Sequence, residues 1–257
     1  MMTWSEGDPH GVTVTVPDQL TLLADLAARL RTGCGFSVAT LNLDHVVKLS
    51  RNPQFRAAYS AHTHVTADGN PIVWLSRLAG QQVSLVPGSE LIEPLIAQAT
   101  RTQVPVAFFG STQETLEAAA DRLRARHPGL EIALSRAPVM DFDPESLDVE
   151  DDIAALKASG ARVVFLALGA PKQELFAARA QTDLPDVGFV SIGAGLDFIA
   201  GTQRRAPAWV RVLAAEWLWR LLEDPMRLAA RYGACIAVLP ELTARAFRAR
   251  RQRRASL

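Results

Sequence analysis

Residues 163–174 read Val163-Val164-Phe165-Leu166-Ala167-Leu168-Gly169-Ala170-Pro171-Lys172-Gln173-Glu174. The six leading apolar residues have no polar break, which is typical of a parallel strand covered by helices on both faces. Pro171 then suits the first turn of a helix, where its missing N–H is harmless. Ligands bind at the carboxyl ends of strands in open α/β sheets, and helix N-termini there favour phosphate. The stretch therefore predicts a ligand site at Gly169, Lys172 and Gln173, with simple capping of the helix as the alternative.

Two further strand ends have a similar construction. Residues 187–201 read as a buried strand followed by Gly193 and Gly195, which would let the backbone approach a ligand, and by Asp197, a candidate acceptor for a sugar hydroxyl. Residues 106–112 add Gly110 and a hydroxyl cap for the next helix. Phe198 stands where a dinucleotide fingerprint would need its third glycine, which argues against a nicotinamide or flavin enzyme. We expect the three ends to form one crevice.

The rest of the chain alternates strands with helices, the pattern of a doubly wound parallel sheet. After Gly201 the strand patterns stop, so we expect an α/β body at 1–200 and a helical appendage at 201–257. The expected strands are 12–16, 36–41, 64–67, 83–86, 104–109, 130–135, 162–168 and 187–192, and the expected helices are 19–31, 44–60 with a break near Pro53, 71–78, 89–100 capped by Ser89, 115–126, 149–158 and 171–180.

Composition narrows the class of protein. The two cysteines, Cys34 and Cys235, lie far apart, so reduced thiols are expected rather than a disulfide. The first ten residues lack the basic and apolar regions of a signal peptide, and no apolar run is long enough to span a bilayer. The five histidines are too scattered to suggest a metal site.

The net charge of zero hides an asymmetry. Residues 201–257 hold twelve arginines, no lysine and four acidic residues, so this part carries +8 and the rest −8. Such a block is typical of a protein with an anionic partner, and tryptophan beside arginine on amphipathic helices favours a membrane surface. Nucleic acid is not expected, because the body is acidic and no base-stacking motif is present. A basic tail that only aids solubility is the alternative.

The sequence resembles the WecG/TagA/CpsF family of bacterial glycosyltransferases over about residues 38–231. No single motif is specific to the family, but the order and spacing of the motifs together are. The matching pieces are Thr40-Leu41-Asn42, Ala67-Asp68-Gly69-Asn70-Pro71, Val86-Pro87-Gly88-Ser89-Glu90, Phe108-Phe109-Gly110, Gly169-Ala170-Pro171-Lys172-Gln173-Glu174, Gly193-Ala194-Gly195-Leu196-Asp197-Phe198, Gly201, Arg205-Ala206-Pro207, Glu216-Trp217-Leu218-Trp219-Arg220, Asp224-Pro225 and Arg227.

The resemblance implies a Rossmann-like body whose appendage completes the site and touches the membrane. It implies transfer of a sugar from a UDP-sugar to a polyprenyl-diphosphate-linked saccharide at the cytoplasmic face of the cell membrane, in the synthesis of a cell-surface polysaccharide. N-acetylmannosamine, its uronic acid and glucuronic acid are the sugars expected first. The reaction would invert the anomeric centre without a metal or other cofactor, and a homo-oligomer is compatible with it.

An inverting transfer needs a carboxylate that takes the proton of the attacking hydroxyl. Asp68 is the candidate, because it ends an extended segment and Gly69 lets the chain turn away; capping of the next helix is the alternative. Thr40 and Asn42 alternate along the preceding strand end, so both are expected to face the sugar, again with capping as the alternative.

The leaving diphosphate needs positive charge, and arginine pairs with phosphate in two-pronged fashion. Arg205, Arg220, Arg227 and Arg231 are the candidates, although an ion pair with Glu216 is an alternative for Arg220. Asp141 and Asp143 have metal-binding spacing but are interpreted as a polar loop before a helix. A tail set (Arg245, Arg248, Arg250, Arg251, Arg253 and Arg254) is expected to face anionic lipid, so that truncation after Glu241 would spare transfer to a soluble acceptor.

Two functions from other classes stay open at this point. One is a nucleotide-sugar oxidoreductase, which the missing third glycine disfavours. The other is a non-catalytic nucleotide-sugar-binding protein at the membrane, which would not need an open carboxylate at Asp68.

Overall fold

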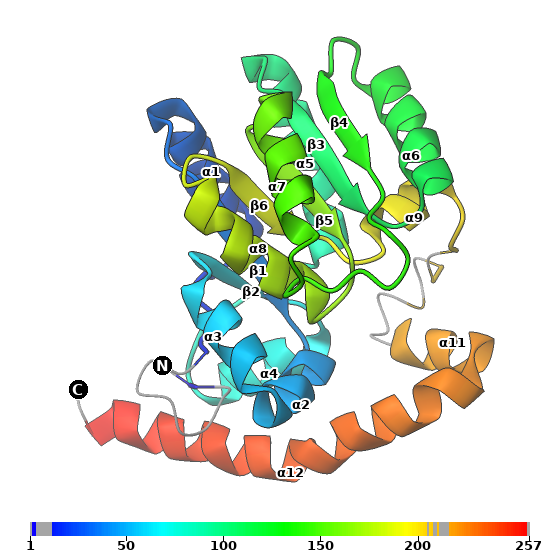
Figure 1. The fold of residues 1–257 in the computed structure, drawn as a ribbon. Coiled ribbons are helices and arrows are strands. Elements are labelled where there is room, and N and C mark those ends of the chain that lie inside the picture. Colours follow the sequence, from blue (N-terminus) through cyan, green and yellow to red (C-terminus); the bar gives the residue numbers. More distant parts are fainter. Residues whose placement is uncertain (1, 4–11, 205, 208–209, 211–215, 256–257) are drawn as a thin grey trace.

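The computed structural model describes the chain apart from residues 1, 4–11, 205, 208–209, 211–215 and 256–257 (Figure 1). The side chains of Arg220, Glu223, Arg227 and Ala255, which lie in helices, are also outside the description. The strands are β1 (Phe36–Leu41), β2 (His64–Ala67), β3 (Val106–Gly110), β4 (Ile132–Arg136), β5 (Val163–Ala167) and β6 (Gly188–Ser191). The helices are α1 (Gln19–Thr32), α2 (Leu43–Arg51), α3 (Pro53–Ala61), α4 (Asn70–Leu78), α5 (Gly88–Thr102), α6 (Gln113–Arg126), α7 (Val149–Ser159), α8 (Lys172–Asp183), α9 (Gly195–Ala200), α11 (Glu216–Glu223) and α12 (Pro225–Ala255).

The described strands form one six-stranded parallel sheet in the order β2-β1-β6-β5-β3-β4. The chain builds one edge with β1 and β2 and the other with β3 and β4, and then fills the middle with β5 and β6. The predicted doubly wound α/β sheet is therefore confirmed. Its parallel strands bring all their carboxyl ends to one edge, where ligands bind in folds of this kind.

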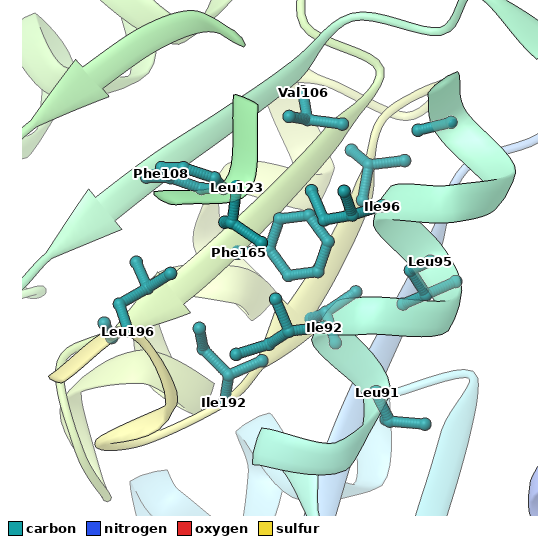
Figure 2. Close-up of a cluster of buried hydrophobic side chains, with 14 of the residues drawn as sticks. Leu91, Ile92, Leu95, Ile96, Val106, Phe108, Leu123, Phe165, Ile192 and Leu196 are labelled. Atoms are coloured by element: carbon teal, nitrogen blue, oxygen red, sulfur yellow. The ribbon is translucent and has the colours of Figure 1, made fainter. Parts of the chain in front are cut away.

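Side chains alternate between two buried layers along β5. Phe165 packs with α1, α5, α6 and α9, whereas Val164 and Leu166 face α7 and α8. Figure 2 shows the first layer, in which Phe165 lies toward Ile92 and Ile96 of α5 and Phe108 lies beside Leu123 of α6. Burial of one such phenylalanine contributes about 1.5–3 kcal/mol. Helices on both faces explain why this strand has no polar residue.

Two of the expected strands and one expected cap are wrong. Residues 12–16 are not a strand, although the amides of Thr15 and Val16 donate to the Val65 carbonyl beside β2. Residues 83–86 contribute only one bridge, from Leu85 to Ala67. Pro87, not Ser89, holds the N-cap position of α5. The two segments run along the outer side of β2, where lone contacts replace a full ladder.

The helix α12 packs against α2 and α4, on the side of the sheet where the strands end (Figure 1). Its Leu242 and Ala246 are 2% and 0% exposed, and both belong to the core that α2, α3 and α4 form with β1 and β2. Truncation after Glu241 would therefore remove core residues together with the tail arginines, so this cut does not isolate the role of the arginines. No helix among the described residues is long and apolar enough to cross a membrane.

Candidate active site

The carboxyl ends of five neighbouring strands carry the residues singled out from the sequence. Asn42 follows β1, Asp68 follows β2, Gly193 follows β6 and Gly169 follows β5, while Gly110 ends β3. All five lie at one edge of one sheet, and they include the three strand ends, at Gly110, Gly169 and Gly193, that were expected to meet. Parallel pairing alone produces this convergence, because neighbouring strands end side by side.

Two glycines of this edge leave room beside the backbone. Gly169 and Gly193 have φ angles of +70° and +53°, and a Cβ on either would meet no atom within 4 Å. Gly110 (φ +124°) instead packs against the Ala167 backbone, where a Cβ would lie 2.5 Å from the carbonyl carbon. Gly195 packs against Ile92, with a Cβ 2.5 Å from its Cδ1, so Gly195 serves helix packing and the expectation of a ligand contact there is wrong.

The side chain of Gln173 joins two of the loops. Its Oε1 accepts the Gly193 amide at 3.2 Å, and its Nε2 donates to Glu174 Oε1 at 2.8 Å. Gln173 is 2% exposed and Glu174 is fully buried, whereas Lys172 is exposed at the start of α8. Gln173 therefore holds the β5 and β6 loops together, and Lys172 remains available to a ligand.

A second link joins the segment after β3 to α9, the helix after β6. The Ser111 hydroxyl donates to Asp197 Oδ1 at 3.3 Å. Asp197 is half-buried, and burial raises its pKa above the ordinary value. Besides Ser111, Gln203 also hydrogen-bonds this carboxyl. Two carboxylate oxygens offer about four acceptor positions, which suits contact with sugar hydroxyls.

Asp68 lies at the junction of β1 and β2. Its amide donates to the Leu41 carbonyl at 2.7 Å, and its side chain is partly exposed. The next residue, Gly69, has a φ angle of +107° and holds the N-cap position of α4. Asp68 is therefore not the N-cap residue of α4, and the alternative interpretation of this residue does not hold.

Thr40 and Asn42 differ from each other more than the strand pattern predicts. Asn42 caps α2, since its Oδ1 accepts the His45 amide at 3.0 Å. Thr40 is 4% exposed beneath the first turn of α5, where a Cβ on Gly88 would lie 3.2 Å from its Cγ2. The capping alternative is thus observed for Asn42, whereas Thr40 is buried, and the role of either side chain in sugar binding stays a prediction.

Behind Asp68 lies a buried polar cluster that the sequence analysis missed. His45 Nδ1 is 2.9 Å from the Tyr59 hydroxyl, and burial lowers the pKa of His45 to about 3. Burial raises the pKa of Tyr59, and the negative charges of Glu174 and Asp68 raise it further. The Tyr59 hydroxyl is therefore hydrogen-bonded to an uncharged imidazole and lies within the electrostatic influence of two carboxyl groups.

The helix α12 of the appendage contacts α2, which follows β1, through Arg231. Its guanidinium lies 3.0 Å from Asp44 Oδ2, which is also 2.8 Å from Lys48 Nζ. Lys48 donates to the Ala170 carbonyl at 2.8 Å and so ties α2 to the glycine–proline loop after β5. Arg205 and the side chains of Arg220 and Arg227 lie outside the described residues.

The expected lipid-facing arginines divide into two groups. Arg245 pairs with Glu241 and its side chain is only 18% exposed, and Arg253 donates to the Gly80 carbonyl at 2.7 Å. These two residues contact the protein itself, so the expectation that all six face lipid is wrong. Arg248, Arg250, Arg251 and Arg254 are exposed.

Within the described part of the chain, no group of three or more acidic, histidine or cysteine side chains is placed to hold a metal ion. The Asp141–Asp143 segment is a turn in which Asp143 Oδ1 accepts the Glu145 amide at 3.0 Å. Phe142, between them, is buried against Phe109 and Phe176.

Comparison with known proteins identifies the family of the chain. The model of the glycosyl transferase WecG/TagA/CpsF family matches residues 8–256. The chain belongs to this family. One relative, a Bacillus spizizenii protein named N-acetylglucosaminyldiphosphoundecaprenol N-acetyl-β-D-mannosaminyltransferase, is 31% identical over 195 residues, which cover 75% of this chain and 73% of the relative.

This member of the family is therefore a glycosyltransferase. That assignment decides against the two alternatives, the oxidoreductase and the non-catalytic binding protein. The polar residues near the strand ends that sequence reasoning did not assign to the site are Asp44, His45, Lys48, Tyr59 and Glu174. Glu174 carried the one available signal, because it is part of the quoted motif after β5.

Proposed function

We propose that this glycosyltransferase transfers N-acetylmannosamine from its UDP derivative to a saccharide carried on polyprenyl diphosphate. The name of the Bacillus spizizenii relative supports the sugar and the acceptor, and the uronic acid of N-acetylmannosamine and glucuronic acid are the next candidates. The single observation that carries the chemistry is Asp68, a partly exposed carboxyl at the strand ends that does not serve as the N-cap of α4.

In the proposed reaction, the acceptor hydroxyl attacks the anomeric carbon while Asp68 takes its proton. A carbon–oxygen bond to the acceptor forms as the bond from the same carbon to the diphosphate breaks, so the anomeric centre inverts. UDP leaves with the bonding electrons. A positioned carboxylate of this kind contributes about 10²–10⁴-fold to the rate.

The donor would lie in the crevice of Gly169 and Gly193. Their open backbone admits a diphosphate, while Asp197 is placed to accept hydroxyl groups of the ribose or sugar. Lys172 and arginines of the appendage, with Arg205, Arg220 and Arg227 as candidates, would neutralise the leaving diphosphate without a metal. The enzyme would act at the cytoplasmic face of the cell membrane, where nucleotide sugars and polyprenyl carriers meet.

The proposal is tested by offering three donors with one acceptor in the presence of EDTA. The acceptor is a short polyprenyl diphosphate that carries N-acetylglucosamine, and the donors are UDP-N-acetylmannosamine, its uronic acid and UDP-glucuronic acid. We expect UDP release to be fastest with the first donor and the product to have the β configuration. Transfer that requires an added divalent metal, or retention of the donor's configuration, would overturn the mechanism.

A further inference from the structure

A second basic site lies between the body and the appendage. A cavity of about 500 Å³ lies between α2 and α12, beside the region where the two helices pack together. Its lining residues are Asp44, Val47, Lys48, Arg51, Asn52, Pro171, Ala230, Arg231 and Ala234. Three of these side chains are cationic, those of Lys48, Arg51 and Arg231, and one, that of Asp44, is a carboxylate. The cavity therefore carries a net positive charge, and the glycine crevice contributes none of its lining residues.

The carboxylate of Asp44 orients Lys48 and Arg231 but leaves some of their N–H groups free to donate to a ligand. Asp44 is 9% exposed and lies 2.8 Å from Lys48 Nζ and 3.0 Å from the Arg231 guanidinium. An arginine has five N–H donors and a lysine has three, so both retain donors for a ligand. Arg51 is exposed at the end of α2, and its side chain makes no hydrogen bond or ion pair within the described part of the chain.

The position of the cavity relative to Asp68 suggests its ligand. α2 begins next to Asn42 at the strand ends and carries Asp44, Lys48 and Arg51 along the cavity. The rise of a helix places Arg51 about 10 Å beyond Asp44. A Cβ on Gly69, the residue after Asp68, would lie 3.8 Å from the Cβ of Asn42, the N-cap of α2. A ligand whose reacting hydroxyl lies near Asp68 can therefore extend an anionic group along α2 into this cavity.

We infer that this cavity binds the diphosphate of the polyprenyl-linked acceptor, while the donor's diphosphate occupies the glycine crevice. The inference rests on the proposed function, which needs two diphosphate groups in one complex. The proposed donor site at Gly169 and Gly193, where the backbone is open on the side of the missing Cβ, takes one of them. The cavity supplies the second position, and it lies beside Pro171, two residues after Gly169 in the same loop.

The assignment changes the expected role of Arg231. The sequence analysis places it at the donor's diphosphate, together with Arg227. The structure instead directs it to Asp44, on the α2 side of the Pro171 loop. Because α2 belongs to the body and α12 to the appendage, an acceptor bound here would contact both parts.

The test measures binding by calorimetry with the full chain, first saturated with UDP and then titrated with farnesyl diphosphate. We expect farnesyl diphosphate to bind the UDP-saturated protein, and Arg51→Ala to weaken it about tenfold, the effect of one charge-assisted hydrogen bond. UDP affinity should not change. Arg101→Ala, which removes an exposed arginine in the last turn of α5, is the matched control and should change neither.

Inorganic pyrophosphate distinguishes the headgroup from the lipid. It should bind the UDP-saturated protein with the same dependence on Arg51, because the cations recognise phosphate oxygens. Competition between farnesyl diphosphate and UDP for one site would overturn the inference, and so would equal affinity of the wild type and Arg51→Ala for farnesyl diphosphate. Neither measurement requires turnover, so a failure to detect sugar transfer would count against the proposed function alone.

Discussion

The carboxyl group of Glu174 shows how far burial can raise the pKa of a single residue. It is fully buried beside Gln173, and burial raises its pKa from 4.5 to about 7. The hydrogen bond from Gln173 and the nearby charge of Lys48 act in the opposite direction but do not outweigh burial. Through Gln173, this carboxyl is connected to the Gly193 amide and hence to the candidate donor crevice.

The pH dependence of stability should reveal this group. The unfolded chain releases the Glu174 proton near pH 4.5, whereas the folded protein holds it to about pH 7, so the contribution of Glu174 to the free energy of unfolding falls as pH rises between these values. Glu174→Gln keeps the acceptor for Gln173 and removes the titration. The variant should gain about 3 kcal/mol relative to the wild type between pH 4 and pH 8. Urea denaturation across this range measures it, and a difference that stays constant with pH would contradict the prediction.

Gly193 allows a second comparison between single residues. Asparagine tolerates its φ of +53°, so Gly193→Asn should fold and place a side chain in the open space beside the crevice. We expect loss of most UDP affinity with a small change in melting temperature. Gly160 ends α7 with a φ of +72° and equally open space, so Gly160→Asn is the matched control for backbone strain. Unchanged UDP affinity in Gly193→Asn would move the donor site elsewhere.

At the scale of elements, the sequence predicts best where local and tertiary preferences agree. The break between α2 and α3 follows from Pro53, and β5 follows from an apolar run that needs helices on both sides. The strands expected at 12–16 and 83–86 were not found, because an apolar run does not say whether a neighbouring backbone will complete its ladder. That information lies in the packing beside β2.

The attachment of α12 depends on residues that its sequence does not mark as core. Leu242 is 2% exposed whereas Phe247, on the same helix, is 50% exposed. Leu242→Ala should lower the free energy of unfolding by about 2–4 kcal/mol, because it leaves a cavity against the body. Phe247→Ala should cost less than about 1 kcal/mol. Urea denaturation compares the two, and equal effects would mean that α12 is not docked as described.

For the molecule as a whole, the sheet edge that carries the strand-end motifs could be predicted from the sequence, but the polar contacts at this edge could not. Motifs after each strand indicate the edge where the glycines meet, since parallel strands end together. The ion pair of Asp44 with Arg231 joins positions nearly two hundred residues apart, and no local pattern encodes such a pairing. The burial of Glu174 is likewise set by the packing of α3 against α8.

The appendage combines exposed apolar and basic side chains. α11 and the start of α12 expose Trp217, Leu218, Leu222 and Met226, and the end of α12 exposes Arg248, Arg250, Arg251 and Arg254. Such a combination supports the proposed attachment to an anionic membrane surface, since basic groups near a negative leaflet contribute about 1 kcal/mol each.

Vesicle binding tests this attachment while leaving the core of α12 in place. Replacement of the four exposed arginines by glutamate should abolish sedimentation with phosphatidylglycerol vesicles, and added salt should weaken binding of the wild type. Transfer to a short soluble acceptor should be unaffected, because these side chains lie beyond the buried Leu242 and Ala246. Wild-type binding that is equal on neutral phosphatidylcholine and unaffected by salt would contradict the electrostatic attachment.

Turnover of Asp68→Asn measures the proposed chemistry most directly. Asparagine keeps the size of the side chain but cannot take the proton of the attacking hydroxyl. We predict that turnover with UDP-N-acetylmannosamine and the lipid-linked acceptor falls by about 10²–10⁴-fold, whereas UDP affinity by calorimetry stays within about twofold of the wild type. Near-normal turnover of Asp68→Asn would contradict the role of Asp68 as the base.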